Sequence, residues 1–126
     1  MKVAIIGSRS FNEYSIVKDF IDRWKNYYKI TIDNIISGGA KGADTLGEQY
    51  ANEYNIPIIK FLPDWNKYGK SAGFRRNKDI IENCDVCFAF WDGESHGTKN
   101  DLDLCKQYNK ECYIYNKQLN KFYKLS

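Results

Sequence analysis

The stretch IISGGAKGADTLGEQYA (residues 35–51) places four glycines within ten residues, between an apolar run and a segment with helical spacing. Glycine lets a backbone adopt unusual conformations and approach a ligand closely. The loop is therefore either a plain tight turn or a pocket of N–H groups for an anion, which the positive end of the following helix would also attract. A turn explains one or two glycines but less easily four. Residues 37–42 are predicted to form a phosphate-binding loop.

Apolar runs of strand length alternate with segments of helical spacing along the whole chain. Strands are predicted at residues 3–6, 32–36, 56–61, 86–91 and 112–115, and helices at 14–27, 44–54, 72–83 and 99–108. Near-continuous Val and Ile runs are typical of parallel strands that are covered on both faces. This order predicts an α/β fold, a Rossmann-like doubly wound parallel sheet of about five strands with flanking helices. Residues 112–125 suit a C-terminal hairpin.

Size and charge limit the classes of function. The 126 residues are expected to form a single domain, residues 1–126. A net charge of +3 is mildly basic, whereas a dedicated duplex-binding domain usually carries a stronger, clustered excess. We see neither a membrane-spanning run nor a signal peptide, so we expect a cytoplasmic protein without a membrane partner. No cofactor is expected.

Four cysteines raise the question of a metal. Cys84 and Cys87 form a CxxC pair, and a zinc site would also recruit Cys105 and Cys112. Cys87, however, falls inside an apolar strand, whereas a zinc knuckle normally lies in a turn. Reduced, buried thiols are expected rather than a metal site.

The loops after the first four strands carry small, hydroxyl or cationic side chains. Because ligands bind beyond the carboxyl ends of parallel strands, these loops are expected to converge at one edge of the sheet. The residues expected to line the ligand site are Gly7, Ser8, Arg9, Phe11, Ser37, Gly38, Gly39, Ala40, Lys41, Asp44, Trp65, Lys70, Gly73, Arg76, Asn77, Trp91, Asp92, Ser95, Gly97 and Thr98.

Charged and aromatic residues in these loops suit a nucleotide. Arg9 and Arg76 can bind a phosphate in bidentate fashion, while Asp44 suits either a ribose hydroxyl or a helix first turn. The loop at residues 61–73 is long for a strand-to-helix connection. Its Trp65 and Lys70 suit a stacked base and a phosphate, or else a packed surface loop.

Together these motifs resemble the SLOG superfamily, the Rossmann-like folds of the DNA-processing protein DprA and the "Lonely guy" enzymes. The chain is most similar to the YspA-type branch of small, often phage- or mobile-element-associated proteins. The matching stretches are Gly7-Ser8-Arg9 with Phe11, SGGAKGAD (residues 37–44), DWNKYGKSAGFRRN (residues 64–77) and FWDGESHGT (residues 90–98).

The resemblance implies binding of a nucleotide or nucleotide-derived ligand. It places Ser37, Gly38 and Gly39 on a first glycine-rich loop and Gly97 and Thr98 on a second. It places Arg76 on the catalytic arginine of the "Lonely guy" group, whose catalytic glutamate is replaced here by Asp101. Arg76 and Asp101 would be catalytic only if the protein is an enzyme. Related proteins often form dimers or larger assemblies, so a homo-oligomer is expected.

Three functions compete on these grounds. The first is sensing or sequestering a nucleoside phosphate, an ADP-ribose derivative or a cyclic signalling nucleotide. The second is a phosphoribohydrolase-type enzyme that cleaves the N-glycosidic bond of a nucleoside monophosphate. The third, by analogy with DprA, is single-stranded DNA binding, which the modest charge ranks last, so a nucleic-acid partner is not expected.

Overall fold

The structure is a computed structural model that describes residues 1–125. Within these residues six strands form one sheet in the spatial order β3-β2-β1-β4-β5-β6. The strands are β1 (Lys2–Gly7), β2 (Asn34–Ser37), β3 (Ile58–Lys60), β4 (Val86–Trp91), β5 (Glu111–Asn116) and β6 (Lys121–Lys124). The first five strands are parallel, and β6 is antiparallel to β5. The long crossovers between the parallel strands leave the carboxyl ends of β1 and β4 side by side.

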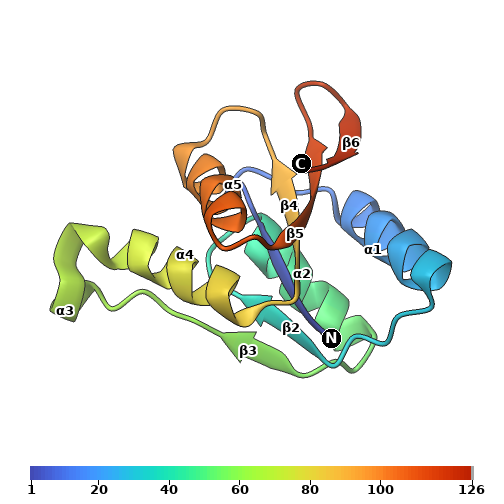
Figure 1. Cartoon of the computed structure of the whole chain (residues 1–126), viewed down its shortest axis with the longest axis horizontal. Coiled ribbons are helices and arrows are strands. Elements are labelled where there is room, and N and C mark those ends of the chain that lie inside the picture. The colour runs from blue at the N-terminus through green and yellow to red at the C-terminus, as the bar shows by residue number, and fades with distance from the viewer. Residues whose placement is uncertain (126) are drawn as a thin grey trace.

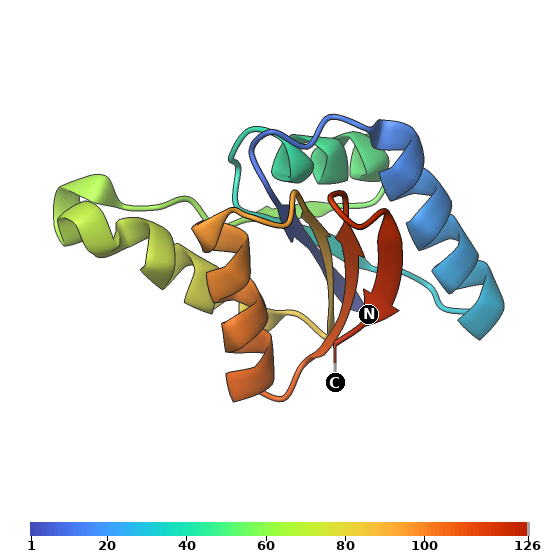
Figure 2. The ribbon, with the colours of Figure 1, turned by 90° about the horizontal axis from the view of Figure 1, so that it is seen from above.

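Helices cover both faces of this sheet (Figures 1 and 2). On one face lie α1 (Tyr14–Tyr28) and α2 (Ala43–Glu53), and on the other lie α4 (Ala72–Asn83) and α5 (His96–Gln107). The short helices α3 (Trp65–Tyr68) and η1 (Gly69–Ser71) precede α4. Figure 2 shows that α3 and the start of α4 project beyond the sheet.

Strand β1 shows how the two-sided core arises. Its side chains alternate between the faces, as the two-residue period of a strand requires. Val3 and Ile5 belong to the core under α1 and α2, whereas Ala4 and Ile6 belong to the core under α4 and α5. All four are at most 2% exposed, which explains the unbroken apolar run in the sequence.

The predicted fold class is confirmed, including the C-terminal hairpin of β5 and β6. Strand β3 is shorter than predicted: it pairs only over Ile58–Lys60 at the sheet edge, and Pro57 just before it has no N–H to donate. Helix α5 begins at His96, three residues earlier than expected. No helix within residues 1–125 is long and apolar enough to cross a membrane.

A close approach between α2 and β1 generates a prediction about stability. A Cβ atom added to Gly47 would lie 2.8 Å from the Cβ of Ile5, in the middle of the core. Gly47→Ala is expected to lower the free energy of unfolding by about 1–3 kcal/mol, because overpacking outweighs the gain in helix propensity of about 1 kcal/mol. Urea unfolding of both proteins measures this difference.

The matched control is Gly97→Ala, at a helical glycine around which a Cβ would meet nothing within 4 Å. It is expected to leave stability unchanged within about 0.5 kcal/mol or to raise it. If Gly47→Ala proved as stable as Gly97→Ala, the close packing of α2 on β1 would be refuted.

Candidate functional site

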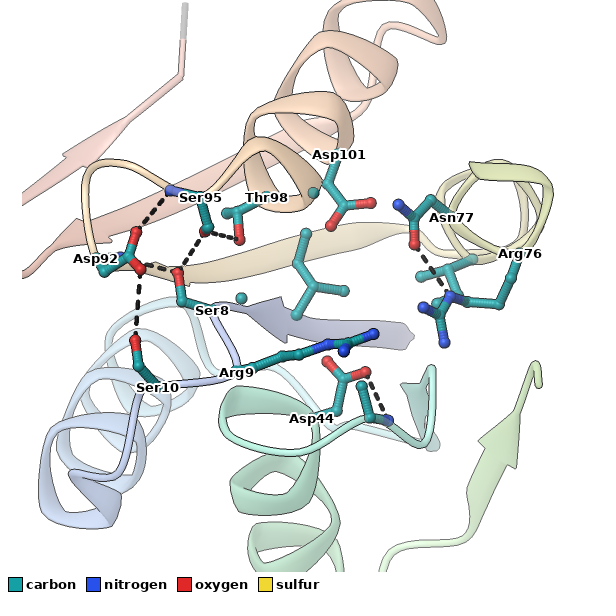
Figure 3. A pocket seen from close by; sticks show the side chains of 15 residues that line it. Ser8, Arg9, Ser10, Asp44, Arg76, Asn77, Asp92, Ser95, Thr98 and Asp101 are labelled. Carbon is teal, nitrogen blue, oxygen red and sulfur yellow. Dashed lines mark hydrogen bonds between the residues drawn. The ribbon is translucent and has the colours of Figure 1, made fainter. Parts of the chain in front are cut away.

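A pocket of about 370 Å³ opens at the carboxyl ends of β1 and β4. The chain leaves β1 towards one face of the sheet and β4 towards the other, which makes this the topological switch point where such folds bind ligands. Figure 3 shows the side chains around it. The walls are formed by Ile6, Gly7, Ser8, Arg9, Ser10, Ala40, Asp44, Arg76, Asn77, Ile80, Asp92, Ser95, Gly97, Thr98 and Asp101.

Ser8, directly after β1, joins the loops around the pocket although it is only 2% exposed. Its N–H donates to the carbonyl of Phe90 in β4, and its own carbonyl accepts the N–H of Ala43 at the start of α2. Its hydroxyl accepts the N–H of Asp92 at 2.9 Å and lies 2.7 Å from the hydroxyl of Ser95. One buried serine thus ties β1, β4, α2 and the loop before α5 together.

The loop between β4 and α5 exposes a helix N-terminus to the pocket. Asp92 accepts hydrogen bonds from the N–H groups of Glu94 and Ser95, both at 2.8 Å, and so folds the loop into a turn. Burial alone would raise the pKa of Asp92, but these bonds lower it. No side chain caps α5, so N–H groups of its first turn remain available near Gly97 and Thr98.

Two arginines reach the pocket from opposite sides (Figure 3). Arg9 follows β1, is exposed and has no ion-pair partner within residues 1–125. Arg76 extends from α4, and its guanidinium donates to the carbonyl of Gly38 and to the side chain of Asn77. The Gly38 bond fixes Arg76, whereas Arg9 is free to meet a ligand.

Two carboxylates line the interior beside these arginines. Burial raises the pKa of Asp44 to about 6, although the N–H of Ala40 and the charge of Arg76 act in the opposite direction. Burial, and next the charge of Asp44, raises the pKa of Asp101 well above its ordinary range. Asp101 is 6% exposed, and its Oδ1 atom has no hydrogen-bond partner within residues 1–125. The interior therefore disfavours a second negative charge near these two groups.

The glycine-rich loop is largely occupied by contacts within the protein, contrary to the expectation of an open phosphate cradle. The Gly39 N–H donates to the hydroxyl of Ser37, and the Ala40 N–H donates to Asp44. A Cβ on Gly42, whose φ is +76°, would lie 2.3 Å from the carbonyl oxygen of Ser8. The glycines thus let this loop fold back on itself and pack against the loop after β1.

Several residues expected at the site do not line this pocket. Phe11 is 1% exposed and packs against Phe90 in the core. Trp91 donates its indole N–H to the carbonyl of Ser95 and supports that loop from outside. The remaining ones are buried Ser37 and Gly38, exposed Gly39 and Lys41, and, on the segment around α3, Trp65, Lys70 and Gly73.

The net charge of the whole chain hides a strongly basic segment, which carries Trp65, Lys70 and Gly73. Residues 60–79, here called the basic arm, carry a net charge of +4 in a chain whose total is +3. The basic side chains are Lys60, Lys67, Lys70, Arg75, Arg76 and Lys78, and the acidic ones are Asp64 and Asp79. The rest of the chain is therefore slightly acidic, a signal that a sliding window over the sequence would have found.

The four cysteines lie away from the pocket wall and are free, buried thiols. Cys87 in β4 and Cys112 in β5 are register partners, and Cys105 of α5 lies in the same core cluster. Their three sulfur atoms lie within 4.8 Å of one another, which is close enough to hold a metal ion. Three thiols without a fourth ligand fall short of a structural zinc site.

Comparison with known proteins identifies the family. Residues 1–68 match the model of the YspA, cpYpsA-related SLOG family, YAcAr. The chain belongs to this family. The Gene 61 protein of Mycobacterium phage D29 is 31% identical over 107 residues, covering 79% of this chain and 83% of that protein. The resemblance to SLOG proteins is thereby confirmed, and a relative is encoded by a phage.

A solved structure extends the comparison to the whole fold of this YAcAr chain. DNA processing protein A from Helicobacter pylori, described for its unique single-stranded DNA binding mode, matches with a TM-score of 0.68 at 24% identity. The match covers 96% of this chain and 67% of that one.

This finding corrects two expectations from the sequence. The first-ranked function, sensing or sequestering a nucleotide-derived molecule, is wrong: the neighbouring structure is described for single-stranded DNA binding, and nothing in the comparisons points to nucleotide sensing. The judgement that a nucleic-acid partner is not expected is also wrong, because the neighbouring fold is that of a protein described as binding single-stranded DNA.

The buried carboxylate of Asp44 generates a prediction about pH. Its pKa in the folded protein, about 6, lies above the ordinary value of 3.8. Its contribution to stability is therefore fully present below about pH 3.8 and lost as the pH rises through about 6. Between pH 5 and pH 7.5 this group is expected to lower the free energy of unfolding by about 1.4 kcal/mol.

Asp44→Asn is expected to remove that part of the pH dependence, measured by urea unfolding at both pH values. Asp103→Asn, which changes a carboxylate that is 63% exposed, is the control and should keep the wild-type slope. An Asp44→Asn protein with the wild-type pH dependence would show that Asp44 is not the buried, proton-retaining group.

Proposed function

We propose that this protein binds single-stranded DNA, with one backbone phosphate at the mouth of the pocket and the adjoining strand along the basic arm. The observation that carries the proposal is the charge of the arm, +4 over residues 60–79 against +3 for the whole chain. Proteins that bind single strands combine such a basic track with exposed aromatic rings. The arm carries both and leads directly into helix α4, which forms one wall of the pocket.

The basic side chains of the arm are available to a phosphate backbone. Lys67, Lys70 and Arg75 are exposed and form no ion pair with any side chain in residues 1–125. Lys60, by contrast, is paired with Glu48 at 3.0 Å. The free cations therefore gather at the projecting end of the arm, where binding would release counterions without first breaking an internal pair.

The pocket mouth supplies a defined phosphate position. The uncapped start of α5, near Gly97 and Thr98, offers N–H groups and the positive end of a helix dipole. Arg9 lies on the same rim and has a free guanidinium. Deeper in the pocket, the Asp44 carboxylate, which is charged above its pKa of about 6, would repel a phosphate and so keep it at the rim.

The comparison supports this proposal at the level of architecture. DNA processing protein A has the same fold over 96% of this chain and is described as binding single-stranded DNA. A modest net charge does not argue against the same activity here, because the charge is concentrated on one segment rather than spread over the surface.

The first test measures the salt dependence of binding to a fluorescein-labelled oligothymidylate by anisotropy. Log affinity is expected to fall linearly with log salt, with a slope near −0.7 for each phosphate contact. The double variant Lys67→Ala/Lys70→Ala should bind more weakly, and its slope should be smaller by about 1.4 if both lysines contact phosphates.

Lys106→Ala/Lys121→Ala is the matched control, because it removes the same charge outside the arm. It should keep the wild-type slope. Equal losses in the two double variants would mean that binding follows net charge alone and would contradict a specific track.

The second test addresses the phosphate position at the pocket mouth. Arg9→Ala is expected to weaken oligothymidylate binding about tenfold, since a hydrogen bond to a charged group contributes roughly 1.5 kcal/mol. Stability should not change, because Arg9 is exposed and unpaired. Unchanged affinity in Arg9→Ala would move the phosphate away from this rim.

A further inference from the structure

We propose that Trp65 is a stacking platform for one base of the bound single strand; this inference rests on the proposed function and adds the residue that contacts the bases. Single-strand binding draws much of its affinity from aromatic rings, because every base has a flat π face. Trp65 is the first residue of α3, at the projecting end of the basic arm (α3 is labelled in Figure 1). Its side chain is 54% exposed, whereas Trp24 is 6% exposed and lies in the core.

The indole of Trp65 lies beside the first turn of α4. Its Cη2 atom lies 3.7 Å from the position that a Cβ would take on Gly73, in the first turn of α4. Asp64 caps α3 by accepting the N–H of Lys67 at 3.1 Å, and the N–H of Gly69 closes the turn on the carbonyl of Trp65. The backbone of the short helix that carries the indole is thus ordered before binding, which lowers the conformational entropy lost on stacking.

The ring of Trp65 makes no stacking or cation–π contact with any other group of residues 1–125. The neighbouring ring of Tyr68 is covered instead, with the Arg75 guanidinium 4.3 Å and the Lys67 ammonium 5.0 Å from its centroid. These contacts place two cations over Tyr68, three residues after the free indole. A base on Trp65 would therefore have cations for its phosphates within the same short segment.

The aromatic surface on α1 and β6 fits a single strand less well. On α1 and β6 the rings pack against one another, as Tyr27 does with Tyr28 at 4.8 Å and Phe20 with Phe122 at 4.5 Å. The acidic Asp19 also lines that surface. Its rings are engaged with each other and its charge is mixed.

Helix α4 connects the platform to the phosphate site. Gly73, which seats the indole, precedes Arg76 on the pocket wall by three residues, a rise of about 4.5 Å along the helix. Helix α4 thus contacts the indole near its first turn and lines the pocket one turn later. A strand with one phosphate at the pocket mouth can run along α4 and lay a base on Trp65.

Trp65→Ala is expected to weaken binding of oligothymidylate about tenfold in the anisotropy assay, with the salt slope unchanged, because stacking releases no counterions. Trp65→Phe keeps a flat ring and should stay within about threefold of wild type. Leu62→Ala removes another exposed apolar side chain of the arm, 65% exposed, and should bind as wild type does. An oligonucleotide made entirely of abasic sites should bind wild type and Trp65→Ala equally.

The outcomes separate this inference from the proposed function. Wild-type affinity in Trp65→Ala, together with weaker binding in Lys67→Ala/Lys70→Ala, would overturn stacking and leave DNA binding intact. Equal losses in Trp65→Ala and Trp65→Phe would also overturn stacking, since the flat ring would not matter. If the wild-type protein binds no oligonucleotide at low salt, both proposals fail.

Discussion

The arrangement of the site depends on the hydrogen bonds of Ser8. Strands β1 and β4 pair side by side, and the Ser8 N–H extends their ladder by one bond beyond Gly7. The carbonyl and hydroxyl of Ser8 then bind the starts of α2 and of the loop before α5. All of these groups are buried, so leaving any of them unpaired would cost about 1–3 kcal/mol. The pocket therefore keeps its shape without a ligand.

Burial of the sheet on both faces explains which parts of the structure could be predicted from the sequence. Uninterrupted apolar runs mark buried parallel strands, and β4 begins and ends where its run does, at Val86 and Trp91. Helix α4 likewise has the predicted bounds. These features are local, because burial on both faces is written into the residue types of each segment.

The site could be predicted only in part, because its details depend on contacts between distant segments. The glycines of residues 37–42 look the same whether their N–H groups face an anion or, as here, bind Ser37 and Asp44. Phe11 follows a strand, a position typical of ligand residues, yet it packs against Phe90 in the core. Asp44 and Asp101 come from two helices far apart in sequence, and only the fold brings them to the same pocket.

Charge separates the surface into two functional parts. Inside the pocket, burial raises the pKa of both Asp44 and Asp101, and Asp44, charged above about pH 6, offsets the charge of Arg76, so the interior does not attract anions strongly. On the arm, by contrast, Lys67, Lys70 and Arg75 lack acidic partners in residues 1–125. A polyanion would be drawn first to the arm and then positioned at the rim of the pocket, where Arg9 and the start of α5 lie. Attraction and positioning thus fall on different residues of one continuous surface.

The most direct test of this account is to titrate the isotopically labelled protein with oligothymidylate at low salt and follow each backbone amide by NMR. We expect the resonances of Gly97, Thr98 and residues 64–76 to shift together and saturably, and those of α1 and β6 to stay in place. Shifts centred on α1 and β6, or no saturable shift at all, would contradict the account.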